Sequence, residues 1–288
     1  MSKIKFKDVF YKYQSQIEDE TNINNETPYA LSNINLEIEQ GEFVCLLGKN
    51  GSGKSTLARL VNGLNLPTSG EVYVDNFSTK DESKIYEIRK KAGIVFQNPD
   101  DQIVSSIVEE DIAFGPENLN LDSSEIEERI DTALDSVSMM DYKFSDPSHL
   151  SGGQKQKIAI ASQLALRQEI IVFDEPMSML DEKDRKDLLS VILKLNKKDK
   201  ITIVLITHNA EEAIYSDRII ALKKGNIEYD GPTKEFFADI ENPKSLGIEI
   251  PVVNKIAHKL SKKIEGFNTN ILTKEDLVKE ILKYKKWV

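Results

Sequence analysis

The sequence predicts an α/β fold with a parallel sheet at its core, and three features carry this prediction. The apolar run Phe43-Val44-Cys45-Leu46-Leu47 has the length and composition of a buried strand. A glycine-rich turn, Gly48 to Gly53, and a helix-forming stretch, Lys54 to Val61, follow it directly. Two later apolar runs, Ile170 to Phe173 and Ile201 to Ile206, are predicted to be further buried strands.

Residues 48–56 have the pattern of a phosphate-binding loop between a strand and a helix. Glycines let the backbone turn where a β-carbon would clash, so that successive N–H groups point inward, and the helix N-terminus adds its positive dipole end. A lysine at position 54 can reach the β- and γ-phosphates, and the Ser55 hydroxyl can bind Mg²⁺. The flanking elements disfavour an ordinary turn, so the predicted nucleotide-binding residues are Gly48, Lys49, Asn50, Gly51, Ser52, Gly53, Lys54, Ser55 and Thr56.

Composition excludes several classes of protein. The 288 residues suit one large or two modest domains, and a net charge of −10 argues against binding nucleic acid by bulk electrostatics. Cys45 is the single cysteine, so we expect no internal disulfide. No apolar run approaches the ~18 residues of a membrane span, and the N-terminus has no signal-peptide pattern. We therefore expect a cytoplasmic chain that can still sit on a membrane partner.

The remaining pattern predicts additions to the parallel core. Alternating residues in Ile4 to Tyr13 and Ala30 to Ile38 predict an antiparallel β-layer, with Gln14 to Tyr29 as an exposed loop between them. Asp101 to Val137 is rich in helix formers and predicts a helical insertion. Pro243 to Pro251 is typical of a linker. We predict an ATP-binding domain over 1–242, a helical subdomain over about 98–165, and a C-terminal extension over 243–288 that could serve dimerisation.

Two further motifs narrow the chemistry. Asp174 ends an apolar strand, where a carboxylate can hold Mg²⁺, and Glu175 is placed next to it to polarise an attacking water. The run Ser151-Gly152-Gly153-Gln154 opens a second helix and hence a second anion-binding end. Since one ATP has one triphosphate, we infer that the second end serves an ATP held by another subunit.

These motifs together resemble the ATP-binding subunits of ABC transporters, over roughly Ile4 to Pro232. The stretch 150–156 resembles the family's signature motif, 48–56 its Walker A motif and 170–174 its Walker B motif. The resemblance makes Glu175 and His208 catalytic, and Ser55, Gln97 and Asp174 the metal-binding residues. It further assigns nucleotide contacts to the signature residues Ser151, Gly152, Gly153 and Gln154, to Asp181 of the D-loop (Ser178 to Asp181), to Gln97, and to Tyr13 as the ring that stacks on adenine, with Tyr11 as the alternative.

A closer resemblance is to the ATPases of energy-coupling factor (ECF) transporters, carried by Phe96 to Gln102 and Val108 to Asn118. Met179-Leu180-Asp181 resembles the first of the two paired ATPases in that family. Met177 and Glu182 depart from the family pattern without removing a phosphate, metal or water ligand. The resemblance implies ATP and Mg²⁺ as cofactors and a position at the cytoplasmic face of the membrane.

The partners implied by this resemblance are a second ATPase, a membrane scaffold and a substrate-binding membrane subunit. The second ATPase is expected to be a different paralogue, with a homodimer as the alternative. We expect import of a vitamin or other micronutrient, a transition-metal ion included, and no nucleic-acid partner. The rival interpretation is a soluble ABC ATPase acting on nucleic acid; a small-molecule kinase leaves the signature stretch unexplained.

Overall fold

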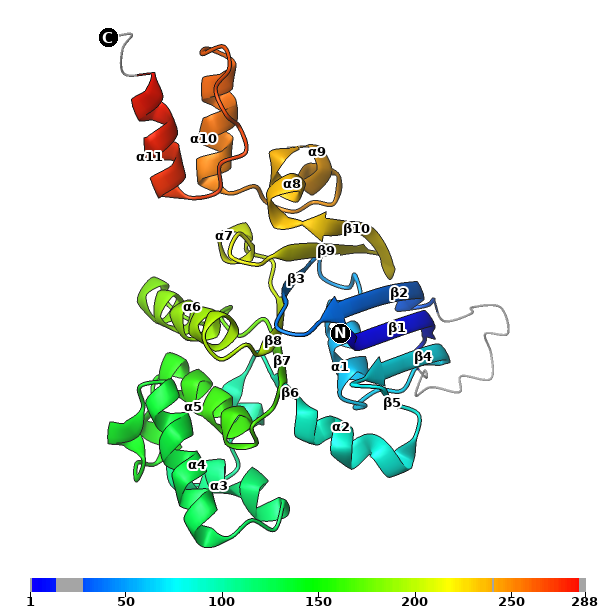
Figure 1. The fold of residues 1–288 in the computed structure, drawn as a ribbon, viewed down its shortest axis with the longest axis vertical. Helices are drawn as coiled ribbons and strands as arrows, with labels where there is room; N and C mark the ends of the chain where they lie inside the picture. Colours follow the sequence, from blue (N-terminus) through cyan, green and yellow to red (C-terminus); the bar gives the residue numbers. More distant parts are fainter. Residues whose placement is uncertain (1, 14–27, 240, 285–288) are drawn as a thin grey trace, which may run out of the picture.

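The structure, a computed structural model, describes residues 2–13, 28–239 and 241–284, and two sheets form its centre (Figure 1). The larger sheet has six strands in the order β10-β9-β3-β8-β7-β6, and the smaller has the antiparallel order β2-β1-β4-β5. Strand β3 pairs in parallel with β8 and β9, while β10 closes the edge as an antiparallel hairpin. The strands are β1 Ser2–Tyr11, β2 Leu31–Glu39, β3 Phe43–Leu47, β4 Ser69–Val74, β5 Phe77–Ser78, β6 Ala92–Val95, β7 Ile170–Asp174, β8 Thr202–Ile206, β9 Arg218–Lys223 and β10 Asn226–Pro232.

The helices form separate groups around these sheets. Helices α3, α4 and α5 gather at one end of the molecule, and α10 and α11 project from the opposite end (Figure 1). None of the helices formed by the described residues is long and apolar enough to cross a bilayer. The helices are α1 Lys54–Val61, α2 Ile85–Lys91, α3 Val108–Asn118, α4 Ser123–Ser136, α5 Gly152–Ala165, α6 Glu182–Lys197, α7 Ala210–Ala213, α8 Thr233–Ala238, α9 Glu241–Ser245, α10 Val252–Ser261 and α11 Lys274–Lys283.

Strand β3 is buried on both faces, which explains its continuous apolar sequence. Val44 and Leu46 pack with α1 and the antiparallel sheet. Cys45 and Leu47, which point to the other face, pack with α7 and α8. The phosphate loop therefore starts from a strand that is fixed on two sides.

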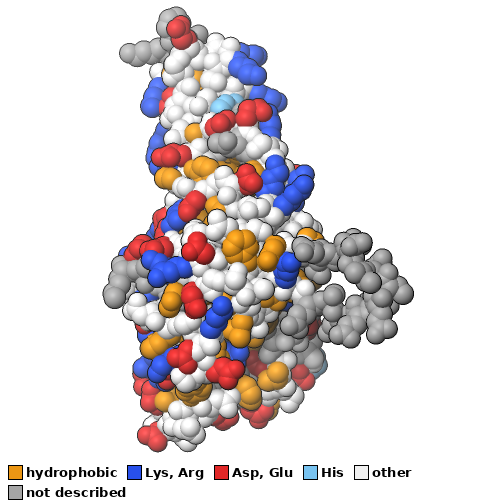
Figure 2. All heavy atoms as spheres, turned by 90° about the vertical axis from the view of Figure 1, so that its right-hand side faces the viewer, with side chains coloured by type: hydrophobic (Ala, Val, Ile, Leu, Met, Phe, Trp, Pro, Cys, Tyr) orange, Lys and Arg blue, Asp and Glu red, His pale blue; other side chains and the backbone are white. Residues whose placement is uncertain are grey.

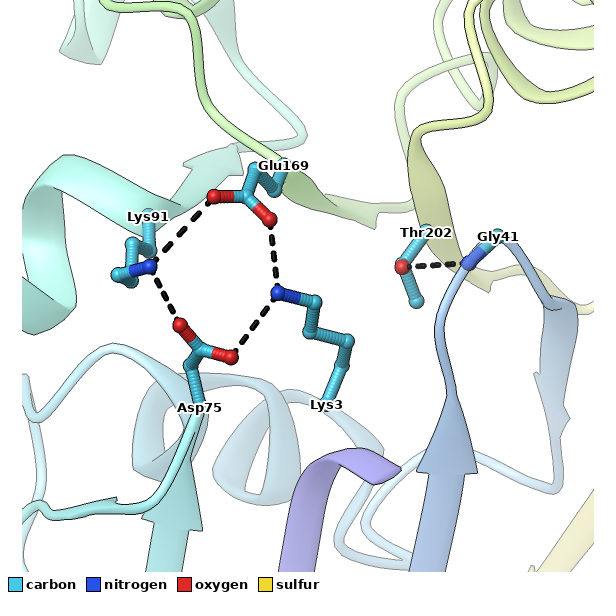
Figure 3. Close-up of polar contacts among 6 residues, drawn as sticks. All are labelled: Lys3, Gly41, Asp75, Lys91, Glu169 and Thr202. Atoms are coloured by element: carbon cyan, nitrogen blue, oxygen red, sulfur yellow. Dashed lines mark hydrogen bonds and ion pairs between the residues drawn. The ribbon is translucent and has the colours of Figure 1, made fainter. Parts of the chain in front are cut away.

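A ring of four charges ties the antiparallel sheet to the edge of the core (Figure 3). The Lys3 ammonium on β1 lies 2.9 Å from Asp75 Oδ1 and 2.7 Å from Glu169 Oε2. Lys91, at the end of α2, closes the ring by pairing with the same two carboxylates. Hydrogen bonds from Lys91 and Lys3 lower the pKa of Asp75. The ring joins four segments that are far apart in the sequence.

Two of the predictions concern segments outside the core. The segment Pro243 to Pro251 is not a free linker: α9 begins before it, and Leu246, Ile248 and Ile250 are buried. Within it, residues 246–250 alternate between buried and exposed, so one side of this stretch packs against the protein. The predicted loop Gln14 to Tyr29 lies, for residues 14–27, outside the described residues.

Candidate active site

The phosphate loop has the geometry that its glycines predict. Gly48 adopts φ +151°, and a β-carbon there would lie 2.4 Å from the Leu222 carbonyl oxygen. Gly53 adopts φ +106° at the start of α1, and no side chain caps that helix end. Its first N–H groups are therefore free to receive an anion. The buried Ser52 hydroxyl has no hydrogen-bond partner among the described residues, which fits a loop that awaits a ligand.

Lys54 is held over the mouth of this loop. Its ammonium donates to the Gly48 carbonyl at 2.9 Å and to the Lys49 carbonyl at 3.3 Å. Burial lowers its pKa, and the nearby carboxylates Glu175 and Asp174 act in the opposite direction. The Lys54 ammonium can exchange these two neutral carbonyl acceptors for phosphate oxygens, because hydrogen bonds between charged groups are stronger.

Ser55 and Asp174 meet at the other side of the loop. The Ser55 hydroxyl donates to Asp174 Oδ1 at 2.9 Å, which brings together the helix α1 and the end of β7. Burial raises the pKa of Asp174, and the Ser55 hydrogen bond opposes that shift. A hydroxyl and a carboxylate beside a triphosphate are ligands that suit Mg²⁺, which is held in such sites by few protein groups. The residues present therefore fit the predicted metal.

Glu175 and His208 stand together at the ends of β7 and β8. The carboxylate Oε2 of Glu175 lies 3.4 Å from Nδ1 of His208, whose side chain is 62% exposed. Glu175 adopts the left-handed conformation, φ +51°, which is costly for a non-glycine residue. Its N–H donates to the Ile206 carbonyl at 3.0 Å, and the Ser178 hydroxyl donates to its carbonyl at 2.9 Å. Two neighbouring segments thus fix the backbone that carries the predicted water-activating group.

A cavity of about 450 Å³ opens over the phosphate loop. Signature residues 151–154 and Asp181 do not line it, and Gly48, Lys49 and Ser52 belong to the loop beneath it. The lining residues are Tyr13, Ala30, Asn50, Gly51, Gly53, Lys54, Ser55, Thr56, Gln97 and Glu175. The structure therefore brings most of the predicted nucleotide contacts of one chain around one space.

The two candidate tyrosines have different surroundings. Tyr13 lines the cavity, is 46% exposed, and its hydroxyl lies 2.8 Å from Thr56 Oγ1. Tyr11 packs against the apolar core and meets the Tyr13 ring edge-on at a centroid distance of 4.9 Å. An adenine can stack on an exposed ring but not on one already covered, so the geometry favours Tyr13 over Tyr11.

A second cavity of about 450 Å³ lies on the other side of Glu175. His208 lines it together with Ser178, Arg185 and Glu212. The buried Glu212 accepts a hydrogen bond of 2.6 Å from Thr207, the residue before His208. Ser178, Thr207 and Glu212 are not among the site residues predicted from the sequence. A Thr directly before a candidate histidine, with an acid five residues later, is the signal that would have found the last two.

The signature helix is complete but lies outside both cavities. Ser151 caps α5 in a capping box with Gln154. The Gln154 N–H donates to the Ser151 hydroxyl at 3.2 Å, and the Ser151 N–H donates to Gln154 Oε1 at 2.8 Å. A β-carbon on Gly153 would lie 2.4 Å from Asp184 Oδ2, whereas one on Gly152 would meet nothing closer than Leu180 Cδ2 at 3.8 Å. Asp181 caps the next helix by accepting from the Asp184 N–H at 2.8 Å. Gly152 is thus an exposed glycine at which a β-carbon would clash with none of the described residues.

Comparisons with known proteins agree with this geometry. The family model for ABC transporters matches residues 31–178. The chain is 46% identical over 282 residues to the energy-coupling factor transporter ATP-binding protein EcfA1 of Clostridium novyi, covering 98% of both chains. It is 48% identical to EcfA1 of Caldanaerobacter subterraneus over 89% of this chain and 93% of that protein.

Solved structures of ABC cassettes share the fold of this chain. CbiO1 of Clostridium perfringens, part of the ABC transporter complex cbiONQ, aligns with a TM-score of 0.75 at 31% identity, covering 91% of this chain and 97% of that one. The cassette MJ0796, solved as a dimer bound to ADP and Pi, aligns with a TM-score of 0.70 at 34% identity, covering 80% and 98%. The predicted α/β fold is confirmed. The chain belongs to the ABC transporter ATP-binding proteins, ABC ATPases, and among them to the EcfA1-type proteins of energy-coupling factor transporters.

Proposed function

We propose that this chain hydrolyses MgATP to power an ECF-type importer that takes up a vitamin or other micronutrient, transition-metal ions included, through membrane partner subunits. One observation carries the proposal. An intact phosphate-loop cavity and a signature helix that does not line it occur in the same chain. Near full-length identity to EcfA1 proteins supports the transport role.

The residues around the cavity divide the chemistry between them. Lys54 and the loop N–H groups neutralise the triphosphate, and Tyr13 stacks on the base. Ser55, Gln97 and Asp174 would hold Mg²⁺, which would supply positive charge to neutralise the phosphates. Glu175 accepts the proton of the attacking water, and His208 holds the γ-phosphate from the second cavity.

A second ATPase subunit completes each site. Gly152 is exposed, and a β-carbon there would meet only Leu180 Cδ2, at 3.8 Å, among the described residues, so a phosphate held by the partner can approach its N–H closely. We assign the last anion contacts to Ser151, Gly152, Gly153 and Gln154, together with Asp181, acting across the interface. The partner is a paralogous ATPase, as the pairing in the resembled family implies. ATP then closes the pair, and hydrolysis reopens it.

The segment Gln97 to Gln102 is the proposed contact with the membrane subunits. It begins at the cavity, which Gln97 lines, and its last residue is fixed by two hydrogen bonds. Gln102 accepts from the Phe96 N–H at 2.8 Å and donates to the Ile94 carbonyl at 3.0 Å. Asp100 is already paired with Lys155 of α5 at 2.7 Å. Asp101 is exposed and bonded to Asn98, which leaves it as the acid that can meet a basic docking helix. The chain would then sit peripherally at the cytoplasmic face.

The rival role, an ABC ATPase acting on nucleic acid, is disfavoured by charge. Figure 2 shows acidic and basic side chains interspersed over the face that carries the antiparallel sheet. The net charge is −10. Phosphate-backbone binding draws its affinity from concentrated positive charge.

Purification of the tagged full chain from a detergent extract tests the proposal. The wild type should bring down its partner ATPase and two membrane proteins. Asp101→Arg should keep ATP binding and lose the membrane proteins, whereas Asp141→Arg, an exposed aspartate outside the segment, should retain them. Recovery of nucleic acid in place of membrane proteins would support the rival. Unchanged assembly of the Asp100→Arg/Asp101→Arg double variant would exclude docking through these acids.

A further inference from the structure

The segment Pro243 to Pro251, which we call the linker segment, is packed into the cassette between the ATP site and the C-terminal extension. Its buried residues Leu246 and Ile248 belong to one apolar cluster with Cys45 and Leu47 of β3. The same cluster contains Ala210 and Ala213, which are the ends of α7. The linker segment therefore rests on two elements at once: the strand that leads into the phosphate loop and the helix that follows His208.

One contact reaches the phosphate loop itself. Gly247 adopts φ +67°, and the Lys49 side chain occupies the space beside it. A β-carbon on Gly247 would lie 1.9 Å from Lys49 Cε and 2.6 Å from its Nζ. Lys223 adds a bond to the same stretch by donating to the Ser245 carbonyl at 3.3 Å. The glycine is needed here because the backbone turns to the left and because the Lys49 side chain lies against it.

A second contact reaches α7, the helix that begins two residues after His208. Where α10 begins, the Val252 N–H donates to Glu211 Oε1 at 2.8 Å. Glu211 lies in the first turn of α7, and its own N–H donates to the cap residue Asn209 at 3.0 Å. Asn209 directly follows His208 in the chain. Glu249 and Gly247 also line the cavity that contains Glu175 and His208.

We propose that the linker segment and the first residue of α10, which follows it directly, position the ATP site: Gly247 of the linker segment holds Lys49, and the Glu211–Val252 bond at the start of α10 holds α7 and hence His208. The position of the extension formed by α10 and α11 then sets the rate of hydrolysis. No residue of the linker segment touches the reacting atoms in this role. The inference rests on the proposed function, because it takes His208 as the γ-phosphate contact.

The contact with α7 is tested in the full chain assembled with its partner ATPase. Glu211→Ala removes the acceptor of the Val252 N–H and should lower kcat by about two- to tenfold, the range that one net hydrogen bond commands, with KM within about twofold of the wild type. Glu211→Gln keeps an oxygen acceptor and should restore kcat. Glu265→Ala, at an exposed acid of the extension, is the matched control. An unchanged kcat in Glu211→Ala, or a Glu211→Gln variant as slow as it, would overturn this contact's role.

The contact with Lys49 is tested by comparing two left-handed glycines. Gly247→Ala and Gly266→Ala carry the same kind of backbone strain, but a β-carbon on Gly266 meets nothing closer than Tyr284 Oη at 3.8 Å. Gly247→Ala should raise the KM for ATP by about two- to fivefold, and Gly266→Ala should not. In a Lys49→Ala background the effect of Gly247→Ala should vanish, since it acts through that side chain. Equal changes at both glycines, or an effect that persists without Lys49, would refute the contact.

The Glu175→Gln variant, measured in the same assays, distinguishes a failure of the proposed function from a failure of the inference about the linker segment. If Glu175→Gln hydrolyses ATP like the wild type, the proposed catalytic assignment fails, whatever the linker variants do. If Glu175→Gln is inactive and the linker variants match the wild type, the inference about the linker segment fails alone. Melting temperatures of all variants establish that each is folded at the assay temperature, so a rate change reports on the site.

Discussion

The two signature glycines offer a test that separates folding from catalysis. Gly152 and Gly153 occupy the first two positions of α5, and neither has a left-handed backbone. A methyl group on Gly152 would enter open space, with Leu180 Cδ2 at 3.8 Å. A methyl group on Gly153 would lie within 2.8 Å of the Asp184 Cβ, Cγ and Oδ2 atoms. Alanine should therefore have opposite effects on stability at the two positions.

The magnitudes follow from these contacts. Replacing a glycine whose backbone suits alanine stabilises a protein by about 0.4–1 kcal/mol, so Gly152→Ala should raise the melting temperature by about 1–3 °C. Overpacking costs about 1–3 kcal/mol, so Gly153→Ala should lower it by several degrees. If the Gly152 N–H receives a partner's γ-phosphate, the methyl group of Gly152→Ala should lower turnover roughly tenfold or more.

The test uses three measurements: calorimetry of the isolated chain, ATP titration of the isolated chain, and turnover of the assembled pair. Gly152→Ala should melt higher than the wild type, bind ATP with wild-type affinity as a monomer, and hydrolyse poorly in the pair. Loss of ATP binding in the monomer would mean that the signature serves the chain's own site. Wild-type turnover would mean that no phosphate approaches Gly152, and the shared site would be wrong.

Four further variants test three individual roles. Glu175→Gln should keep ATP binding and lower turnover by on the order of 100-fold, because an amide cannot accept the proton of water; wild-type hydrolysis would remove Glu175 from this role. Tyr13→Ala should weaken ATP binding roughly tenfold without changing its dependence on Mg²⁺, and Tyr11→Ala should mainly lower the melting temperature; the reverse pattern would transfer stacking to Tyr11. Burial raises the pKa of Asp174 in the folded chain, so ionisation of this carboxyl opposes folding. The protonated carboxyl therefore contributes to the free energy of unfolding at low pH, and this contribution is lost as the pH rises through the raised pKa. Asp174→Asn should therefore melt about 2 °C higher than the wild type at pH 7 without nucleotide, yet gain no protection from MgATP; a lower melting point would contradict the sign.

Sequence pattern predicted the core because each of its signals is local. The run Phe43 to Leu47 is apolar throughout because both faces of β3 are covered. The runs Ile219 to Leu222 and Ile227 to Tyr229 pair as an antiparallel hairpin, since a two-residue turn fixes the register of their strands. Asp174 ends β7 and Glu175 follows it as expected, because their place depends only on where that strand ends.

Features that depend on remote partners were not predictable in the same way. Prolines and charges made Pro243 to Pro251 resemble a linker, but Leu246 and Ile248 are buried in an apolar cluster whose other members range from Cys45 to Leu272. Tyr11 and Tyr13 lie two positions apart, so strand alternation gives both the same face and cannot rank them. Their difference arises from Thr56, which meets the Tyr13 hydroxyl across the phosphate loop.

The contacts around Gln97 give the proposed mechanism a physical route between the two ATP sites. Gln156 of the signature helix donates to the Phe96 carbonyl at 2.9 Å, and Lys155 pairs with Asp100 at 2.7 Å. The segment that begins at the cavity over the phosphate loop is thus bonded at two points to α5, which carries the signature residues. A movement of this segment on loss of the γ-phosphate would therefore act on α5 through these two bonds. Since the same helix would serve the partner's ATP, release at one site would withdraw anion contacts from the other.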